Sequence, residues 1–125
     1  MSEPLARYPY EAPVTAYGNG GFRFADMSHR GSILCLPTGV FAWEPADPRA
    51  LTVTDLARAL ADMKPQSVLL LGTGPTQIFP SAEVTRAFAA AQIGLEPMST
   101  GAAARTYNIL LGERRAIGAA LIAVA

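Results

Sequence analysis

The sequence has 125 residues, with 10 Lys and Arg against 10 Asp and Glu, and 50% of its residues are hydrophobic. This length and apolar content suit one domain with a single core, and they exclude a disordered or strongly charged chain. The charge is balanced in both halves of the chain, so no basic region stands out that would bind nucleic acid or an anionic membrane surface.

The scarcity of cysteine and histidine excludes further classes. A single cysteine, Cys35, allows no intramolecular disulfide, and one histidine, His29, leaves too few ligands for most protein metal sites, so we expect no metal site. The longest apolar stretch, residues 116–125, is shorter than the roughly 20 residues of a spanning helix. The first residues lack the pattern of a secretory signal or a transit peptide. We therefore expect a cytoplasmic protein with no direct membrane insertion.

The first third of the chain is predicted to be β structure. Three prolines in residues 1–13 indicate an extended N-terminal arm, and residues 14–125 are predicted to form a single domain. Residues 14–17 and 22–25 read as a hairpin around Gly18-Asn19-Gly20-Gly21. Residues 32–36 and 39–43 follow as two strands joined by a turn. Residues 26–31, which include His29, are expected to form a solvated turn.

The rest of the chain alternates between helices and strands. Thr52 to Asp55 has the form of a capping box for a helix that continues to Met63. A strand over residues 67–71 is apolar throughout, as expected when both faces are covered. A second helix is predicted to be capped by Ser81 and ended by Gly94. A short strand over residues 95–98 should lie near an edge because of its proline. A third helix is predicted from Thr100 to about residue 111. Residues 117–124 form the last strand, whose direction the pattern leaves open.

Together these elements predict a three-layer α/β domain, with a mixed, partly parallel sheet, helices on its faces and extra antiparallel strands from residues 14–43. Two segments follow the carboxyl ends of neighbouring strands, namely Gly72-Thr73-Gly74 and Ser99-Thr100-Gly101. Ligands gather at such ends, and free amides at the start of the third helix would favour an anion. The simpler interpretation is that Thr100 is an ordinary N-cap and that the glycines permit tight turns.

Three further patterns are weighed against their structural alternatives. A dinucleotide loop is excluded because Gln77 stands where the third glycine of that motif would be. Asn108, inside a predicted helix, needs a fixed partner: either the backbone of residues 72–74, which would make it a structural clamp, or a ligand, and we favour the clamp. The neighbours of His29 cannot form a nucleophilic triad, and Cys35 is expected to be an inert packed thiol.

The motifs also resemble a known family. The chain resembles the Mth938-like domain family in four segments: residues 69–74 (LLLGTG), 94–100 (GLEPMST), 103–110 (AARTYNIL) and 113–115 (ERR). The family includes the mitochondrial complex I assembly factor 3. The match runs from about residue 21 to residue 124. The resemblance implies a three-layer α/β fold with additional strands and no firmly attached catalytic activity or cofactor. It implies a role in assembling respiratory complex I through protein contacts. The family's motif positions in this sequence are Gly72, Thr73, Gly74, Thr100, Ala103, Thr106, Asn108, Glu113 and Arg115.

Two hypotheses of function remain open. The first is a non-catalytic protein-interaction domain, an assembly or chaperone-like factor for a respiratory membrane complex, in which Glu113 and Arg115 contact complex subunits or assembly factors. The second is a small-molecule or anion-binding protein, or an enzyme, with a pocket formed by Gly72 to Gly74, Thr100, Gly101, Ala103, Thr106 and Asn108. The lack of a recognisable acid–base pair favours the first, and the oligomeric state is not decided by the sequence.

Overall fold

The computed structural model describes residues 5–125 and consists of eight strands, three α-helices and two short 3₁₀ turns. The strands are β1 (Val14–Gly18), β2 (Gly21–Phe24), β3 (Met27–Arg30), β4 (Ser32–Leu36), β5 (Gly39–Trp43), β6 (Val68–Gly72), β7 (Gly94–Met98) and β8 (Ile117–Leu121). The helices are α1 (Ala57–Asp62), α2 (Ala82–Ala91) and α3 (Thr100–Gly112), with 3₁₀ turns η1 (Pro48–Ala50) and η2 (Thr54–Leu56).

The larger sheet has five strands in the order β5-β4-β8-β6-β7. Strand β6 is parallel to both β7 and β8, whereas β4 is antiparallel to β8 and β5. The last strand, β8, lies at the centre of the sheet and runs parallel to the apolar strand β6, which settles the direction that the pattern left open. Strand β7 is an edge strand, as its proline predicted.

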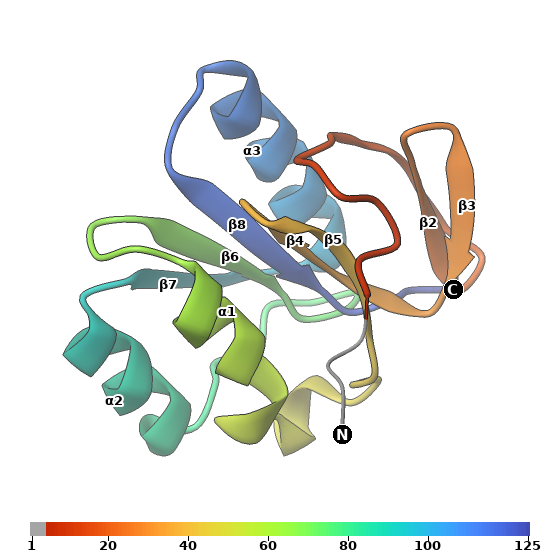
Figure 1. Ribbon diagram of the computed structural model, residues 1–125. Coiled ribbons are helices and arrows are strands. Elements are labelled where there is room, and N and C mark those ends of the chain that lie inside the picture. Colours follow the sequence, from red (N-terminus) through yellow and green to blue (C-terminus); the bar gives the residue numbers. More distant parts are fainter. Residues whose placement is uncertain (1–4) are drawn as a thin grey trace.

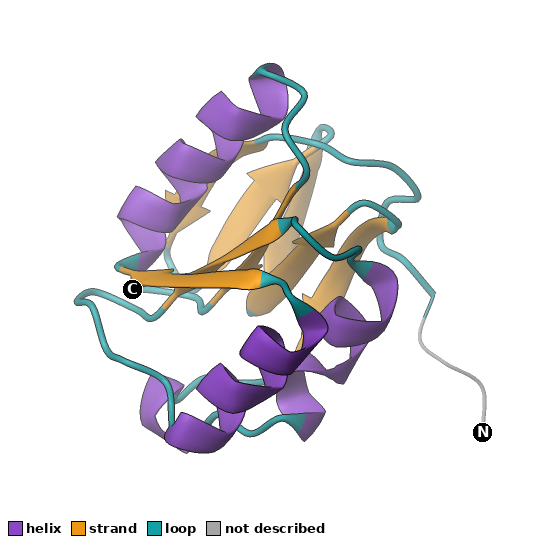
Figure 2. Cartoon of the chain, turned by 90° about the vertical axis from the view of Figure 1, so that its left-hand side faces the viewer, coloured by secondary structure: helices purple, strands orange, loops and turns teal. Residues whose placement is uncertain are grey.

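The domain has three layers, as predicted. Helices α1 and α2 cover one face of the five-stranded sheet, while α3 and the smaller sheet cover the other (Figures 1 and 2). Side chains of β4 alternate between the two hydrophobic clusters, one on each face of the sheet. Leu34 and Leu36 belong to the cluster beneath α1 and α2, whereas Ile33 and Cys35 belong to the cluster beneath α3. Such a strand reads as a continuous apolar run because both its faces are buried.

The smaller sheet contains the predicted hairpin and one strand that the sequence analysis missed. Strands β1, β2 and β3 are paired antiparallel in that order. The expectation of a solvated turn over residues 26–31 is wrong, because residues 27–30 pair with β2. The turn between these strands is made by Ala25 and Asp26, both with positive φ. That conformation suits a tight hairpin, but Ala-Asp is not a sequence that signals one.

Helix boundaries follow the predicted caps with two corrections. Thr52 and Asp55 form the reciprocal capping bonds, although the helix begins as the 3₁₀ turn η2 before α1. The Ser81 hydroxyl accepts from the amide of Val84 and caps α2. Helix α2 does not end at Gly94, because Gln92 already adopts the left-handed conformation (φ 59°) that terminates it.

The N-terminal arm lies along the edge of the larger sheet. The amide of Val40 donates to the carbonyl of Tyr8 at 2.9 Å, so the described part of the arm pairs with β5. The predicted arm also includes residues 1–4, which lie outside the described residues. The paired part of the arm shields an edge strand that would otherwise be open.

Candidate functional site

The two glycine-containing segments meet at the carboxyl edge of the larger sheet. Strands β6 and β7 are parallel neighbours, so the residues that follow them lie side by side. The amide of Thr73 donates to the carbonyl of Met98 at 2.9 Å, and the amide of Thr100 donates to the carbonyl of Gly74 at 2.8 Å. The backbones of the two segments therefore satisfy one another.

Thr100 joins three segments of the chain, and it is not the N-cap of α3. That position belongs to Ser99, whose hydroxyl accepts from the amide of Ala102. The Thr100 side chain is fully buried; its hydroxyl accepts from the amide of Gly74 at 2.9 Å and donates to the carbonyl of Ile122 at 2.7 Å. A hydroxyl that both donates and accepts within the fold has a structural role here.

The loop after β6 is held by its own residues. A Cβ atom at Gly72 would lie 3.0 Å from the Cα of Thr100, so the close approach of α3 requires glycine there. The Thr73 hydroxyl donates to the carbonyl of Thr76 at 2.7 Å and accepts from the amide of Ile78 at 3.0 Å. Gly74 has a φ of +96°, which favours glycine. These residues shape a tight turn.

Asn108 is a clamp, but its partner is not the loop after β6. Its Oδ1 accepts from the amide of Val14 at 2.8 Å, and its Nδ2 donates to the carbonyl of Val14 at 2.7 Å. Both hydrogen bonds run to one residue of β1 that lies 94 positions earlier in the chain. The side-chain amide thus takes the place of a neighbouring strand and attaches the smaller sheet to α3.

The remaining candidate residues on α3 differ in their surroundings. Ala103 is fully buried in the core beneath α3, and Thr106 is half-buried. Gly101 lies against Tyr17, since a Cβ atom added there would be 2.5 Å from the tyrosine oxygen. Tyr107, also fully buried, has a hydroxyl without a hydrogen-bond partner in the described part of the chain, and burial is the main reason why its pKa is raised.

A cavity of about 400 Å³ opens at this edge, beside the start of α3. Gly74, Ser99 and Gly101 line it together with Tyr17 and Arg105, and the Nη1 of Arg105 donates to the tyrosine oxygen at 3.0 Å. Of the predicted pocket residues, only the two glycines line this cavity; Thr73, Thr100 and Asn108 bond within the fold. The cavity is therefore walled by small residues, one tyrosine and one arginine.

The predicted interaction residues follow α3 and are exposed. The side chains of Glu113 and Arg115 form an ion pair of 3.7 Å and are 56% and 65% exposed. Such a pair contributes little to stability. Ile109, one turn earlier on the same helix, is 62% exposed. An exposed apolar side chain thus stands one turn before an exposed charged turn.

The structure also shows the surroundings of Cys35 and His29. The Cys35 thiol is fully buried, and burial raises its pKa to about 12, consistent with an inert packed residue. His29 lies in β3, where its Nε2 is 3.2 Å from the carbonyl of Ser32. Burial, and then repulsion from Arg7, lower its pKa. No group of three metal-ligating side chains is found among residues 5–125, nor is any helix there long and apolar enough to cross a membrane.

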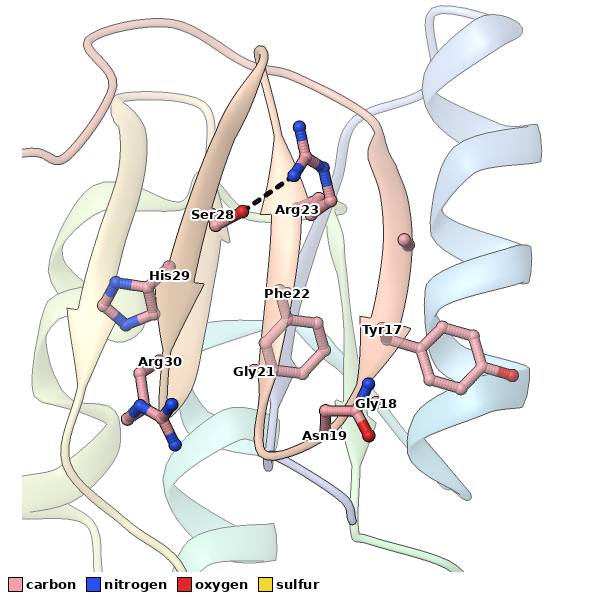
Figure 3. Close-up of a pocket in the computed structure, with 10 residues that line it drawn as sticks. Tyr17, Gly18, Asn19, Gly21, Phe22, Arg23, Ser28, His29 and Arg30 are labelled. Carbon is pink, nitrogen blue, oxygen red and sulfur yellow. Dashed lines mark hydrogen bonds between the residues drawn. The ribbon is translucent and has the colours of Figure 1, made fainter.

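Sequence reasoning missed a second cavity, of about 430 Å³, on the outer face of the smaller sheet (Figure 3). Arg23 and Arg30 are among the residues that line it. The alternation Phe22-Arg23-Phe24 could have placed Arg23 on the face opposite the core. Arg30 could not be placed in this way, because its strand was expected to be a turn.

The architecture described above is that of an Mth938-like domain. A solution structure from Bordetella pertussis that carries this description is 32% identical and superposes with a TM-score of 0.76, covering 98% of this chain and 92% of that one. The agreement includes the mixed five-stranded sheet and its helices, so the fold class predicted from sequence is confirmed.

The chain belongs to the DUF498/DUF598 family, described as a protein of unknown function, whose model matches residues 14–122. An uncharacterised protein of Rhodobacter capsulatus is 36% identical over 110 residues, which is 88% of this chain and 83% of the relative. A crystal structure described as an outer membrane protein from Bartonella henselae is 45% identical, with a TM-score of 0.89, and covers 95% of this chain and 100% of that one.

Proposed function

We propose that this chain is a non-catalytic protein-interaction domain that acts as an assembly or chaperone-like factor for a respiratory membrane complex. The observation that carries the proposal is that the predicted pocket hydroxyls at the carboxyl edge of the sheet, those of Thr73 and Thr100, are already bonded within the fold. In a domain with an active site at this edge, polar side chains would point into the opening, whereas here the hydroxyls of Thr73 and Thr100 are bonded to backbone groups of the fold.

The contact surface in this proposal is the end of α3 and the turn that follows it, defined by Ile109, Glu113 and Arg115. Protein interfaces commonly combine an exposed apolar side chain with arginine at the centre of the contact. The exposed ion pair of the turn costs little to break. Arg115 is therefore available for a carboxylate of a partner, while Ile109 supplies apolar area.

The membrane setting of the partner has separate support. The resemblance of the motifs to complex I assembly proteins suggests a membrane complex as the client. The Bartonella henselae relative is described as an outer membrane protein, which also favours a search for partners in membranes.

Co-purification from native membranes tests the proposal. Tagged wild-type protein and the Arg86→Ala control, altered on α2, should recover the same reproducible partner, whereas Arg115→Ala should recover at least about fivefold less. Failure of the wild-type protein to recover any reproducible partner would overturn the proposal. Equal recovery by Arg115→Ala would remove the turn from the contact.

The competing hypothesis, a small-molecule or anion-binding protein with its pocket at the carboxyl edge, is favoured by the cavity of about 400 Å³. The guanidinium of Arg105 is held there by Tyr17. A metabolite thermal-shift screen separates the two functions. A ligand that stabilises the wild-type protein but not Arg105→Gln would support this alternative, and the absence of any stabilising ligand would exclude it.

A further inference from the structure

The outer face of the smaller sheet carries a trough with a floor of small residues. In strands β1 to β3, opposite partners share a face of the sheet, so the register places Ala16, Arg23 and Ser28 in one outward row and Gly18, Gly21 and Arg30 in the next. Ala16 is exposed, Gly18 is half-buried and Gly21 is buried, so no long side chain fills the space between the arginines at these positions. The result is the cavity of about 430 Å³ in Figure 3.

Two arginines stand at either side of this floor. In Figure 3, the guanidinium of Arg23 lies toward one end of the trough, beside Ser28, and that of Arg30 toward the other. The Nη1 of Arg23 donates to the Ser28 hydroxyl at 2.9 Å, which uses one of its five N–H donors and orients the rest. Arg23 and Arg30 are diagonal neighbours on one face of the sheet, which places their Cα atoms roughly 7–8 Å apart, within reach of one ligand.

The positive charge of the trough is not neutralised by the fold. Both arginines are exposed, and within residues 5–125 neither forms an ion pair with a carboxylate. No Asp or Glu side chain lines the cavity, although acidic and basic residues are equal in number over the whole chain.

The shape of the site favours an extended ligand over a single small ion. The arginines lie at separate ends of the floor, and the trough adjoins the cavity at the carboxyl edge because Tyr17 lines both. An extended chain rises about 3.3 Å per residue, so acidic side chains two to four positions apart match two arginines separated in this way. Arginine binds carboxylates with two parallel hydrogen bonds, which adds geometry to the charge attraction.

We propose that the outer face of strands β1 to β3 binds an extended acidic segment of a partner protein, with its carboxylates on Arg23 and Arg30. The inference rests on the proposed function as a protein-interaction domain, but it concerns a different surface from the turn after α3. The acidic segment lies over Ala16 and Gly18, where no long side chain obstructs its backbone.

Fluorescence anisotropy with a defined probe tests this site. The probe is a fluorescein-labelled ten-residue peptide of alternating Glu and Ser, and its control has Gln in place of Glu. The acidic peptide should bind the wild-type protein and weaken several-fold as NaCl rises from about 50 to about 300 mM, while the Gln peptide should not bind. The double variant Arg23→Gln with Arg30→Gln should bind at least about tenfold more weakly.

Matched variants make the outcome specific. Arg86→Gln removes an exposed arginine from α2 and should bind as the wild type does, whereas Ala16→Glu places a carboxylate on the floor and should abolish binding while both arginines remain. Circular dichroism checks that each variant is folded. Arg115→Ala should bind the peptide normally, so failure of the proposed contact at the turn is distinguishable from failure of this site.

Results of three kinds would overturn the proposal. The first is equal affinity of the wild type and the arginine double variant for the acidic peptide, or no binding to the wild type. The second is displacement of the peptide by inorganic phosphate at concentrations comparable to that of the peptide, which would indicate a small-ion site. The third is tighter binding of a ten-nucleotide oligothymidylate than of the peptide, which would indicate a nucleic-acid ligand.

Discussion

Replacing Asn108 by alanine should detach β1 from α3 and lower the stability of the whole domain. The substitution removes two hydrogen bonds of 2.8 and 2.7 Å to Val14. Val14 is only 4% exposed, so its amide and carbonyl would be left largely unpaired. Each buried backbone group that loses its hydrogen-bond partner costs about 1–3 kcal/mol. Water that enters the half-buried position of the missing side chain offsets part of this cost. We expect a loss of about 2–3 kcal/mol, which lowers Tm by roughly 10 °C in a domain of this size.

Urea denaturation followed by circular dichroism measures this loss. The control is Ile109→Ala on the next position of α3, where the side chain is mostly exposed and the change should stay within about 0.5 kcal/mol. Asn108→Asp adds a second check: the carboxylate keeps the acceptor for the Val14 amide but opposes the Val14 carbonyl at pH 7. Protonation restores a donor, so the deficit of this variant should shrink at pH 4. A loss below about 0.5 kcal/mol for Asn108→Ala would refute the clamp.

Three further predictions concern other positions. Thr100→Val should lower the free energy of unfolding in urea by about 2–4 kcal/mol, because two buried backbone groups lose their hydroxyl partner. Thr100→Ser should keep most of the stability, and equal losses in the two variants would contradict this role. Gln92→Gly should raise the free energy of unfolding by about 0.5–1 kcal/mol, because glycine adopts the left-handed conformation at this position (φ 59°) without strain. A decrease would show that the left-handed conformation of Gln92 is not strained. Burial, and then repulsion from Arg7, hold the folded-state pKa of His29 below its ordinary value of 6.5. The stabilising contribution of the neutral side chain is therefore complete above pH 6.5 and is lost as pH falls through the lower folded-state pKa. His29→Gln should therefore flatten the dependence of Tm on pH between 7 and 5, and an unchanged slope would contradict the assignment.

The parts of the fold that the sequence predicted are those governed by local rules. The reciprocal bonds of Thr52 and Asp55 and the cap at Ser81 depend on residues three positions apart, which a linear pattern displays. The buried strand β6 was evident from its unbroken apolar run, and Pro97 indicated an edge strand. Periodicity and capping therefore sufficed for the α/β alternation in the last two thirds of the chain.

The parts that the sequence could not predict depend on distant partners or on unusual turns. Asn108 was expected to need a partner, but nothing in the pattern points to Val14, which lies 94 positions away. Strand β3 was missed because Ala25 and Asp26 make a turn with positive φ without glycine or asparagine. The role of Thr100 was obscured because its neighbour Ser99 is an equally good cap.

The contact surface at the end of α3 carries the central claim that this domain acts by binding a protein, and site-specific photocrosslinking tests it most directly. A benzophenone-bearing amino acid is placed at position 109, and, as the control, at position 86 on α2. We expect position 109 to yield one reproducible crosslinked protein in native membranes and position 86 to yield none, and Arg115→Ala in the same chain should suppress the adduct. The same adduct from both positions, or none from position 109 when the partner co-purifies, would contradict it.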